Sequence, residues 1–348
     1  MDFARKSFDL GYDFFRNSLF YLTKKDPEVA HELFVSFGKA VSRFGLDRLL
    51  LDNPTNRYSL KEGVVVSNAA GLNKNGDIPP RFLKYLGFDR VVVGTVTNEA
   101  YDGKPRPRMK RYPFTESLVN WMGLPGVGSK RVAENLERYF DYGIPTTVNV
   151  MSTPGKRGNE ALEDIEGTVN DARQYTDRFE LNISCPNTHS KGGELDVREE
   201  YQKSLSDMLG VVFSSRIAEQ EVYVKVSPDM DRDDVCDILD VVKDFNVSGI
   251  TGTNTTTEHD PKYINPSLGK GGASGQAVKK FSFFTQELFM DEIEKRRMDL
   301  KYISVGGIDS GAEALRRVDL GACELQILTP LIFKGPKLLR EIRERLRA

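Results

Sequence analysis

The chain has 348 residues, of which 39% are hydrophobic. This length is enough for one large core, because an α/β barrel takes about 250 residues and would leave roughly 100 for additional elements. The 49 basic and 51 acidic residues give a formal net charge of -2, which offers no electrostatic reason to expect a nucleic-acid partner. The three cysteines, Cys185, Cys236 and Cys323, are too few and too scattered for a disulfide framework or a zinc site. They predict a reducing compartment and no metal centre.

Residues 1 to about 50 have the periodicity of helices only. Asp26 and Pro27 predict the start of a second helix, because aspartate favours the N-cap and proline the first turn. No run of about 18 apolar residues and no apolar centre of a secretory signal is present, so neither a spanning helix nor a leader is expected. The apolar residues at helical spacing are Phe3, Phe8, Tyr12, Phe15, Leu19 and Phe20, then Ala30, Leu33, Phe34, Phe37 and Val41.

From about residue 60, short apolar and β-branched runs alternate with helical stretches. Such runs are typical of strands that are buried on both faces of a parallel sheet. Eight runs with helical segments between them predict an α/β fold, a (β/α)8 TIM barrel over residues 51–348 with a small helical extension, residues 1–50. A doubly wound sheet is the alternative, but the runs show no reversal at their midpoint. The runs are 64–66, 90–93, 146–150, 179–183, 222–226, 249–252, 302–305 and 324–328.

Polar side chains follow or interrupt five of the predicted strands. Because the chemistry of a TIM barrel lies at the C-terminal ends of its strands, these groups predict a polar pocket at one face. Lys225 stands between Val224 and Val226, where an unpaired ammonium is costly to bury. It either extends to the barrel mouth or balances an anionic ring or reduced cofactor, and its neighbours favour the second. The polar residues are Thr95, Thr97, Asn149, Asn182, Asn187, Lys225, Thr253, Asn254, Thr255 and Thr256.

Two glycine-rich segments predict a phosphate site. Gly306 and Gly307 end the seventh predicted strand, and residues 271–275 form a glycine-rich loop before it. In many barrels the loops after strands 7 and 8 bind phosphate through backbone N–H groups beside a helix N-terminus. No Gly-x-x-x-x-Gly-Lys-Ser/Thr motif is present, so a nucleoside triphosphatase is not indicated. A phosphate site beside a polar barrel mouth suggests a mononucleotide cofactor such as FMN.

Cys185 has two interpretations. A lone cysteine near a strand end is usually a small core hydrophobe. This one lies between Asn182 and Asn187, with Pro186 fixing the turn, and such amides suit a planar, anionic, carbonyl-rich substrate. Since thiols ionise nearer neutrality than hydroxyls, Cys185 is a candidate base for proton abstraction.

Taken together, the strand-end segments resemble the dihydroorotate dehydrogenase family over about residues 20 to 345. The order and spacing of the whole set are specific to this family, although each segment alone would be weak evidence. The matching segments are 69–76, 93–97, 105–108, 120–125, 182–187, 253–256, 271–275, 305–308 and 333–336.

The resemblance implies an FMN enzyme of pyrimidine synthesis that oxidises dihydroorotate to orotate. In this reaction a base removes a proton from C5 of the substrate while a hydride leaves C6 for N5 of the flavin, and Cys185 falls on the base position. The substrate-contacting positions are Lys74, Asn120, Met122, Gly123, Leu124, Asn182, Asn187, Asn254 and Thr255. The flavin-contacting positions are Ala70, Gly71, Lys74, Thr95, Asn149, Asn182, Lys225, Thr253, Ser274, Gly275, Gly306, Gly307, Leu328 and Thr329.

The family has two branches, and the chain resembles both. The N-terminal helices, which include His31, are similar to those of the membrane-associated, quinone-using branch. Arg111 stands where that branch has an arginine beside its quinone tunnel. Cys185 as the base, and residues 120–125, are similar to the soluble branch, while Gly126 stands where either branch has asparagine. The resemblance therefore implies a quinone acceptor and a peripheral position at the cytoplasmic face of a membrane. A soluble cytoplasmic enzyme that uses fumarate or another soluble acceptor is the alternative.

Alternatives remain for the role of the N-terminal helices and for the reaction that the chain catalyses. The helices either cap the barrel or contact lipid through aromatic residues, with Lys24 and Lys25 near the headgroups. Other functions are a related flavin-dependent reductase of dihydropyrimidines, a reductase of dihydrouridine in tRNA, and a flavin-binding protein without activity. The charge balance disfavours the tRNA enzyme, and Lys74, Cys185, Asn182 and Asn187 disfavour an inactive protein. The aromatic residues are Phe14, Phe15, Phe20 and Tyr21.

Overall fold

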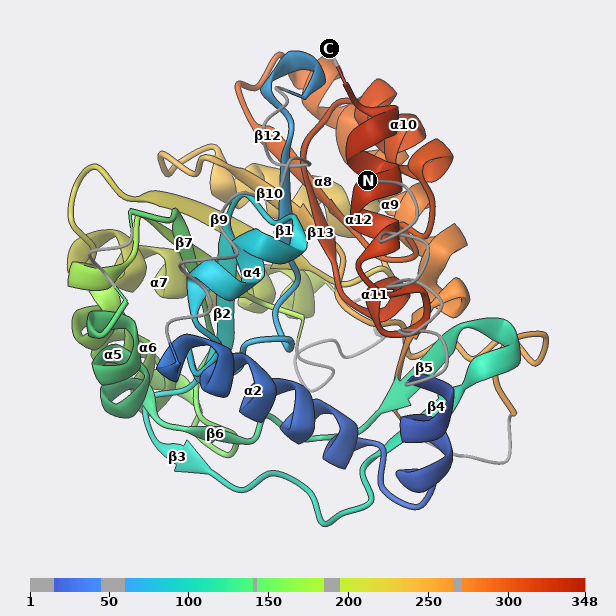
Figure 1. The fold of residues 1–348 in the computed structure, drawn as a ribbon. Coiled ribbons are helices and arrows are strands. Elements are labelled where there is room, and N and C mark those ends of the chain that lie inside the picture. The colour runs from blue at the N-terminus through green and yellow to red at the C-terminus, as the bar shows by residue number, and fades with distance from the viewer. Residues whose placement is uncertain (1–15, 45–59, 140–142, 185–194, 266–270, 348) are drawn as a thin grey trace.

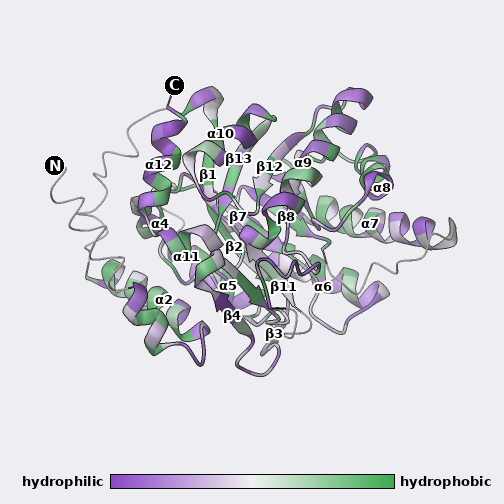
Figure 2. Cartoon of the chain, turned by 90° about the vertical axis from the view of Figure 1, so that its right-hand side faces the viewer, coloured by the Kyte–Doolittle hydropathy of each residue, from purple (hydrophilic) through white to green (hydrophobic). Residues whose placement is uncertain are grey.

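The computed structural model describes residues 16–44, 60–139, 143–184, 195–265 and 271–347 of the chain (Figure 1). Cys185 and Asn187, and the predicted helical residues 1–15, lie outside this part. Hydrophobic residues gather in the central strands, whereas the N-terminal helix α2 (Glu28–Arg43) carries both hydrophobic and hydrophilic residues along its length (Figure 2).

Eight parallel strands form the central sheet of the described chain, in the order β1-β13-β12-β10-β9-β8-β7-β2. Each predicted strand is present, and the bounds differ from the prediction by no more than a few residues because a strand's ends are set by its neighbours. The strands are β1 (Val65–Asn68), β2 (Val91–Val96), β7 (Thr146–Val150), β8 (Arg178–Asn182), β9 (Glu221–Val226), β10 (Gly249–Gly252), β12 (Lys301–Val305) and β13 (Ala322–Ile327).

The first and last strands of this order, β1 and β2, meet and close the barrel. The buried side chain of Asn68 donates a hydrogen bond from Nδ2 to the Val92 carbonyl at 2.7 Å, and its Oδ1 accepts one from the Val92 N–H at 3.1 Å. A parallel bridge joins Ser67 to Arg90, and the Asp89 N–H donates to the Val66 carbonyl. The (β/α)8 barrel is therefore confirmed, and the doubly wound alternative is wrong.

Helices follow most strands and surround the barrel (Figure 1). Two of them begin at side-chain caps: Asp231 and Asp234 form a capping box at the start of α8, and Ser310 accepts a hydrogen bond from the Glu313 N–H at the start of α10. The helices are η2 (Lys61–Gly63), α4 (Pro80–Leu86), α5 (Ser129–Glu137), α6 (Gly158–Ala172), η5 (Arg173–Tyr175), α7 (Leu195–Ser215), α8 (Arg232–Val242), α9 (Gln276–Arg296), α10 (Gly311–Asp319), α11 (Thr329–Lys334) and α12 (Lys337–Arg345).

Strand β8 shows how polar residues come to line the inside of the barrel. Successive side chains of a strand point to opposite faces, and Phe179 and Leu181 join the main hydrophobic core. The alternating residues Arg178, Glu180 and Asn182 face the barrel interior. Arg178 contacts Glu324 of β13 across the barrel, with 2.6 Å between Nη1 and Oε2. The interior thus carries charged layers below the polar mouth.

Two small antiparallel sheets extend from the barrel. One contains β4 (Met109–Tyr112), β5 (Ser117–Asn120) and β11 (Gly272–Gly275), with η3 (Pro113–Thr115) joining β4 to β5. The other pairs β3 (Ala100–Tyr101) with β6 (Gly126–Val127). The glycine-rich segment 271–275, expected as a loop, therefore contains a strand, because its backbone pairs with β5. This pairing holds the glycines beside Asn120.

The N-terminal segment is helical over residues 16–22 and in α2, as predicted for the described residues. Helix α2 begins one residue later than expected, and the Asp26 carboxylate accepts a hydrogen bond from the Glu28 N–H. A buried bidentate ion pair joins α2 to the chain before β4: the two Glu28 carboxylate oxygens lie 2.8 and 2.9 Å from Nη2 and Nε of Arg108. Arg106 adds partners in Asp26 and Glu32.

Candidate active site

A connected cavity of about 2620 Å³ opens where the barrel strands end and continues between α2 and residues 16–22. It brings together every predicted site residue in the described part of the chain except Asn149, whose side chain lies beneath it. The predicted residues that line the cavity are His31, Ala70, Gly71, Lys74, Thr95, Arg111, Asn120, Met122, Gly123, Leu124, Asn182, Lys225, Thr253, Asn254, Thr255, Ser274, Gly275, Gly306, Gly307, Leu328 and Thr329.

Lys74 and Met122 meet on one wall of this cavity. The Lys74 ammonium lies 2.9 Å from the Met122 sulfur. Burial lowers the pKa of Lys74 to about 8, although the Glu28 carboxylate acts in the opposite direction. After Met122 the chain turns sharply, because Gly123 and Leu124 both have positive φ angles, 72° and 59°. Such a backbone is costly for leucine, and residues held in this way often belong to functional sites.

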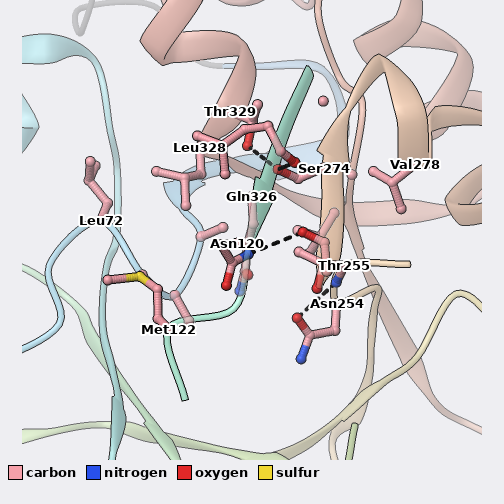
Figure 3. A pocket seen from close by; sticks show the side chains of 18 of the residues that line it. Leu72, Asn120, Met122, Asn254, Thr255, Ser274, Val278, Gln326, Leu328 and Thr329 are labelled. Atoms are coloured by element: carbon pink, nitrogen blue, oxygen red, sulfur yellow. Dashed lines mark hydrogen bonds between the residues drawn. The ribbon is translucent and has the colours of Figure 1, made fainter. Parts of the chain in front are cut away.

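Amide side chains from several elements lie close together in the pocket (Figure 3). Asn120 donates to the Gly272 carbonyl at 3.3 Å, and Asn254 accepts from the Thr255 N–H at 2.8 Å. Asn182, at the end of β8, donates to the Thr95 hydroxyl at 3.3 Å and accepts from the Ser184 N–H at 3.1 Å. Side chains of this kind can donate and accept hydrogen bonds around a flat ligand rich in amide and carbonyl groups.

A second part of the cavity is rich in donors and lacks bulky side chains. The backbone N–H groups of Gly306, Gly307 and Thr329 donate to no acceptor in the described part of the chain. The hydroxyls of Ser274 and Thr329 lie 2.9 Å apart (Figure 3). A Cβ atom on Gly307 would collide with Lys279, and φ there is 69°, so only glycine fits without strain. These donors suit a phosphate group.

The floor of the cavity is formed by Lys225, which is 4% exposed. Its Nζ lies 3.5 Å from Oε1 of Glu180, a carboxylate with no exposed surface. Burial alone would raise the pKa of Glu180, but the Lys225 ammonium and hydrogen bonds from Gln326 and Asn149 hold it below its usual value. Lys225 thus lies at the pocket, and the sequence analysis did not include its carboxylate partner.

His31 and Arg111 line the part of the cavity between the N-terminal helices and the barrel. The His31 Nε2 lies 2.7 Å from the Leu72 carbonyl, and burial lowers the pKa of the imidazole. Arg111 donates to the Thr23 carbonyl and hydroxyl, and its guanidinium lies 4.1 Å from the centre of the Phe20 ring. Its buried Nη1 has no partner in the described residues, and burial lowers the pKa of the guanidinium to about 10.

Sequence reasoning missed Glu180, Gln326 and the pair of Glu28 with Arg108. The Arg-Phe-Glu-Leu-Asn alternation of β8 was a signal for Glu180, because polar residues two apart share one face of a strand. The same alternation in Glu324-Leu325-Gln326 was a signal for Gln326. The pairing of Glu28 with Arg108 had none, since the two residues are 80 positions apart.

A barrel whose cavity brings amide, hydroxyl and ammonium groups together at the C-terminal ends of its strands defines the chain as a TIM-barrel enzyme. A family model described as dihydroorotate dehydrogenase matches residues 58–348. The chain therefore belongs to the dihydroorotate dehydrogenase family, which confirms the resemblance seen in its strand ends.

Individual relatives extend the match to the N-terminal helices. A dihydroorotate dehydrogenase (quinone) of Marinomonas sp. is 32% identical over 343 residues, 95% of each chain. The protein of that name from Haloarcula marismortui is 34% identical over 283 residues, 81% of this chain and 77% of the relative. The ligand-free DHODH structure from Eimeria tenella superposes with a TM-score of 0.77 at 26% identity, and covers 92% of this chain and 94% of that one.

Proposed function

We propose that the chain oxidises dihydroorotate to orotate with bound FMN and passes the electrons to a quinone. The observation that carries this proposal is the continuity of one cavity. It joins the amide-lined wall near Lys74 to the phosphate-compatible donors and the Lys225 floor, and then reaches Arg111 and His31. A substrate, a cofactor and a second electron acceptor thus have adjoining places in the same cavity.

The donors and small residues of the cavity fit FMN. Gly306, Gly307 and Thr329 would hold its phosphate through N–H groups, with Ser274 and Gly275 beside them. Lys225, Asn182 and Thr95 would contact its ring. Bound FMN supplies the acceptor for the hydride that leaves C6 of the substrate. The remaining proposed cofactor contacts are Ala70, Gly71, Lys74, Asn149, Thr253 and Leu328.

The substrate would lie against the wall that carries Lys74. Its carboxylate suits the Lys74 ammonium, and its ring amides suit the Asn120, Asn182 and Asn254 side chains. Met122, Gly123 and Leu124 would complete this wall, with Thr255 and Asn187 as further contacts.

Cys185 is the proposed base that takes the proton from C5. It lies outside the described residues, but the chain enters its segment from the substrate wall. The Ser184 hydroxyl donates to the Lys225 carbonyl at 3.0 Å, and the Ser184 N–H donates to Asn182. Ser184, the residue directly before Cys185 in the sequence, therefore lies beside Asn182 and Lys225. As a thiolate, Cys185 would accept the proton while the amides hold the substrate ring in place.

The N-terminal segment, residues 1–50, is the proposed element for quinone access and peripheral membrane contact. No helix in the described ranges is both long and apolar enough to span a bilayer. However, Tyr21 and Leu22 are 79% exposed, and Leu33 and Phe37 of α2 are 49% and 61% exposed. Exposed apolar side chains on short helices suit a position in the plane of a lipid interface. Quinone would enter between these helices toward Arg111.

Anaerobic flavin spectroscopy tests the function directly. Dihydroorotate should bleach the absorbance of the FMN-loaded protein, and a quinone should restore it faster than fumarate does. Faster recovery with fumarate would support the soluble acceptor. A folded chain that cannot be loaded with FMN, or whose flavin dihydroorotate does not bleach, would refute the proposal.

Replacing the base should stop the first half-reaction. Cys185→Ala should slow flavin reduction by dihydroorotate by about 10²- to 10⁴-fold, the usual contribution of a general base, while FMN stays bound. Stopped-flow absorbance measures the rate. Cys236→Ala is the matched control, because that cysteine lies on α8 and contacts Glu292. Equal rates in the two variants would remove Cys185 from the mechanism.

The buried ammonium of Lys74 should give orotate binding a pH dependence. Lys74 is charged below its pKa of about 8 and neutral above it, whereas the orotate carboxylate stays ionised throughout. The dissociation constant of orotate should therefore be constant below pH 8 and rise about tenfold per pH unit above it. Titration calorimetry from pH 6.5 to 9.5 measures this. Lys74→Arg should remove the rise, and an unchanged slope in that variant would assign the titration to another group.

Arg111 should matter for the second half-reaction. Arg111→Met removes the guanidinium that faces the outer cavity, so flavin reoxidation by a quinone should slow at least tenfold, while a soluble dye reoxidises it normally. Arg131→Met, at an exposed position of α5, is the control. Equal loss with both acceptors would show that Arg111 only stabilises the fold. Deleting residues 1–50 is a less clean test, because it would also leave Arg108 buried without Glu28.

A further inference from the structure

Glu180 is a buried carboxylate beneath the cavity, and the proposed reaction gives it no task. Strand β8 holds it inside the barrel with no exposed surface. Side chains from several other strands converge on it, including the Thr251 hydroxyl of β10. Asn149 Nδ2 of β7 donates to its Oε1 at 2.6 Å, Gln326 Nε2 of β13 donates to its Oε2 at 2.9 Å, and Lys225 Nζ of β9 lies 3.5 Å from Oε1.

This arrangement determines how the two amides are turned. An ionised carboxylate can only accept hydrogen bonds, so Asn149 and Gln326 must present their nitrogen atoms to Glu180. Their oxygen atoms are left over. Asn149 Oδ1 and Gln326 Oε1 are buried and have no partner among the described residues. A buried acceptor without a donor is costly, and Gln326 lines the cavity (Figure 3). The free Gln326 oxygen therefore suits a ligand that brings a donor to the cavity floor.

Glu180 also determines how much positive charge the floor carries. Its charge offsets part of the charge of Lys225, which is the ammonium that lines the cavity there. In a buried site the effective dielectric constant is low, so one charge acts strongly on its neighbours. Reduction of a ligand above the floor adds negative charge, and Glu180 opposes that step while Lys225 favours it.

We propose that Glu180 is a positioning residue of the cofactor pocket, which turns the Gln326 amide so that its oxygen can accept from the flavin ring, and which limits the positive charge beneath it. The inference rests on the proposed FMN cofactor. It assigns Glu180 an effect on the affinity and the midpoint potential of bound FMN, neither of which requires dihydroorotate or quinone to be measured.

The test uses Glu180→Gln in the FMN-loaded chain. The substitution keeps the side-chain size and removes the negative charge. It also replaces one of the two carboxylate oxygens by an NH2 group, so that either Asn149 or Gln326 loses its acceptor. We expect the dissociation constant of FMN to rise at least tenfold. We also expect the reduced flavin to be stabilised about tenfold relative to the oxidised form, which is about 30 mV for a two-electron couple. Anaerobic redox titration at one fixed pH for all variants measures the potential.

Glu324→Gln is the matched control. Glu324 is also buried inside the barrel, and it pairs with Arg178 and the Ser67 hydroxyl, none of which lines the cavity. This variant should leave FMN affinity and potential unchanged. Equal shifts in both variants, or no shift in Glu180→Gln, would overturn the inference.

A second variant covers the case in which Glu180→Gln fails to fold because Lys225 loses its partner. Glu180→Gln combined with Lys225→Met removes both charges. Compared with Lys225→Met alone, the double variant should bind FMN at least tenfold more weakly, because the amides lose their fixed orientation. Equal affinities would overturn the inference. A wild-type chain that does not bind FMN would overturn the proposed cofactor as well, so the two failures are distinguishable.

Discussion

The hydrogen bonds of Asn68 to Val92 close the barrel, and the position of the candidate site depends on this closure. The Asn68 amide meets both the N–H and the carbonyl of Val92, as a neighbouring strand would. Because it is buried, water cannot compete for these bonds. The segment that follows β1 carries Lys74, so closure also brings Lys74 to the same mouth as the residues after β8 and β10. The cavity is thus a product of topology as much as of its lining residues.

The sequence predicted the eight strands because each is a short, largely apolar run, and a parallel strand covered on both faces has to be apolar. It predicted the site because strand ends of a barrel share one face, so Thr95, Asn182 and Asn254 could be grouped without coordinates. It could not give the strand in residues 272–275, because pairing with β5 is decided by tertiary contact and four small residues carry little intrinsic preference.

The sequence alone also could not predict which side chains make contact across the barrel. Glu180 and Gln326 are 146 positions apart, and only the closed sheet brings them together. The alternation of polar and apolar residues in β8 places Glu180 on one face of the strand, but it gives no indication of whether its partner is a lysine, an amide or a cofactor. The structure shows that Lys225 has both a carboxylate and a cavity beside it. Neither interpretation of Lys225 included this carboxylate: the lysine is paired in the interior and also lines the cavity.

The ion pair of Glu28 with Arg108 has a consequence for how this protein can change over evolution. Glu28 belongs to the helical extension, while Arg108 belongs to the chain that leads into β4, and their side chains are buried together. Loss of Glu28 leaves the buried Arg108 guanidinium without its carboxylate, whereas loss of Arg108 leaves Glu28 with the more distant Arg106, 3.6 Å away. The two positions should therefore vary together among related chains. A related barrel without the helical extension would have no partner for a buried arginine at this position, and we expect a different residue there.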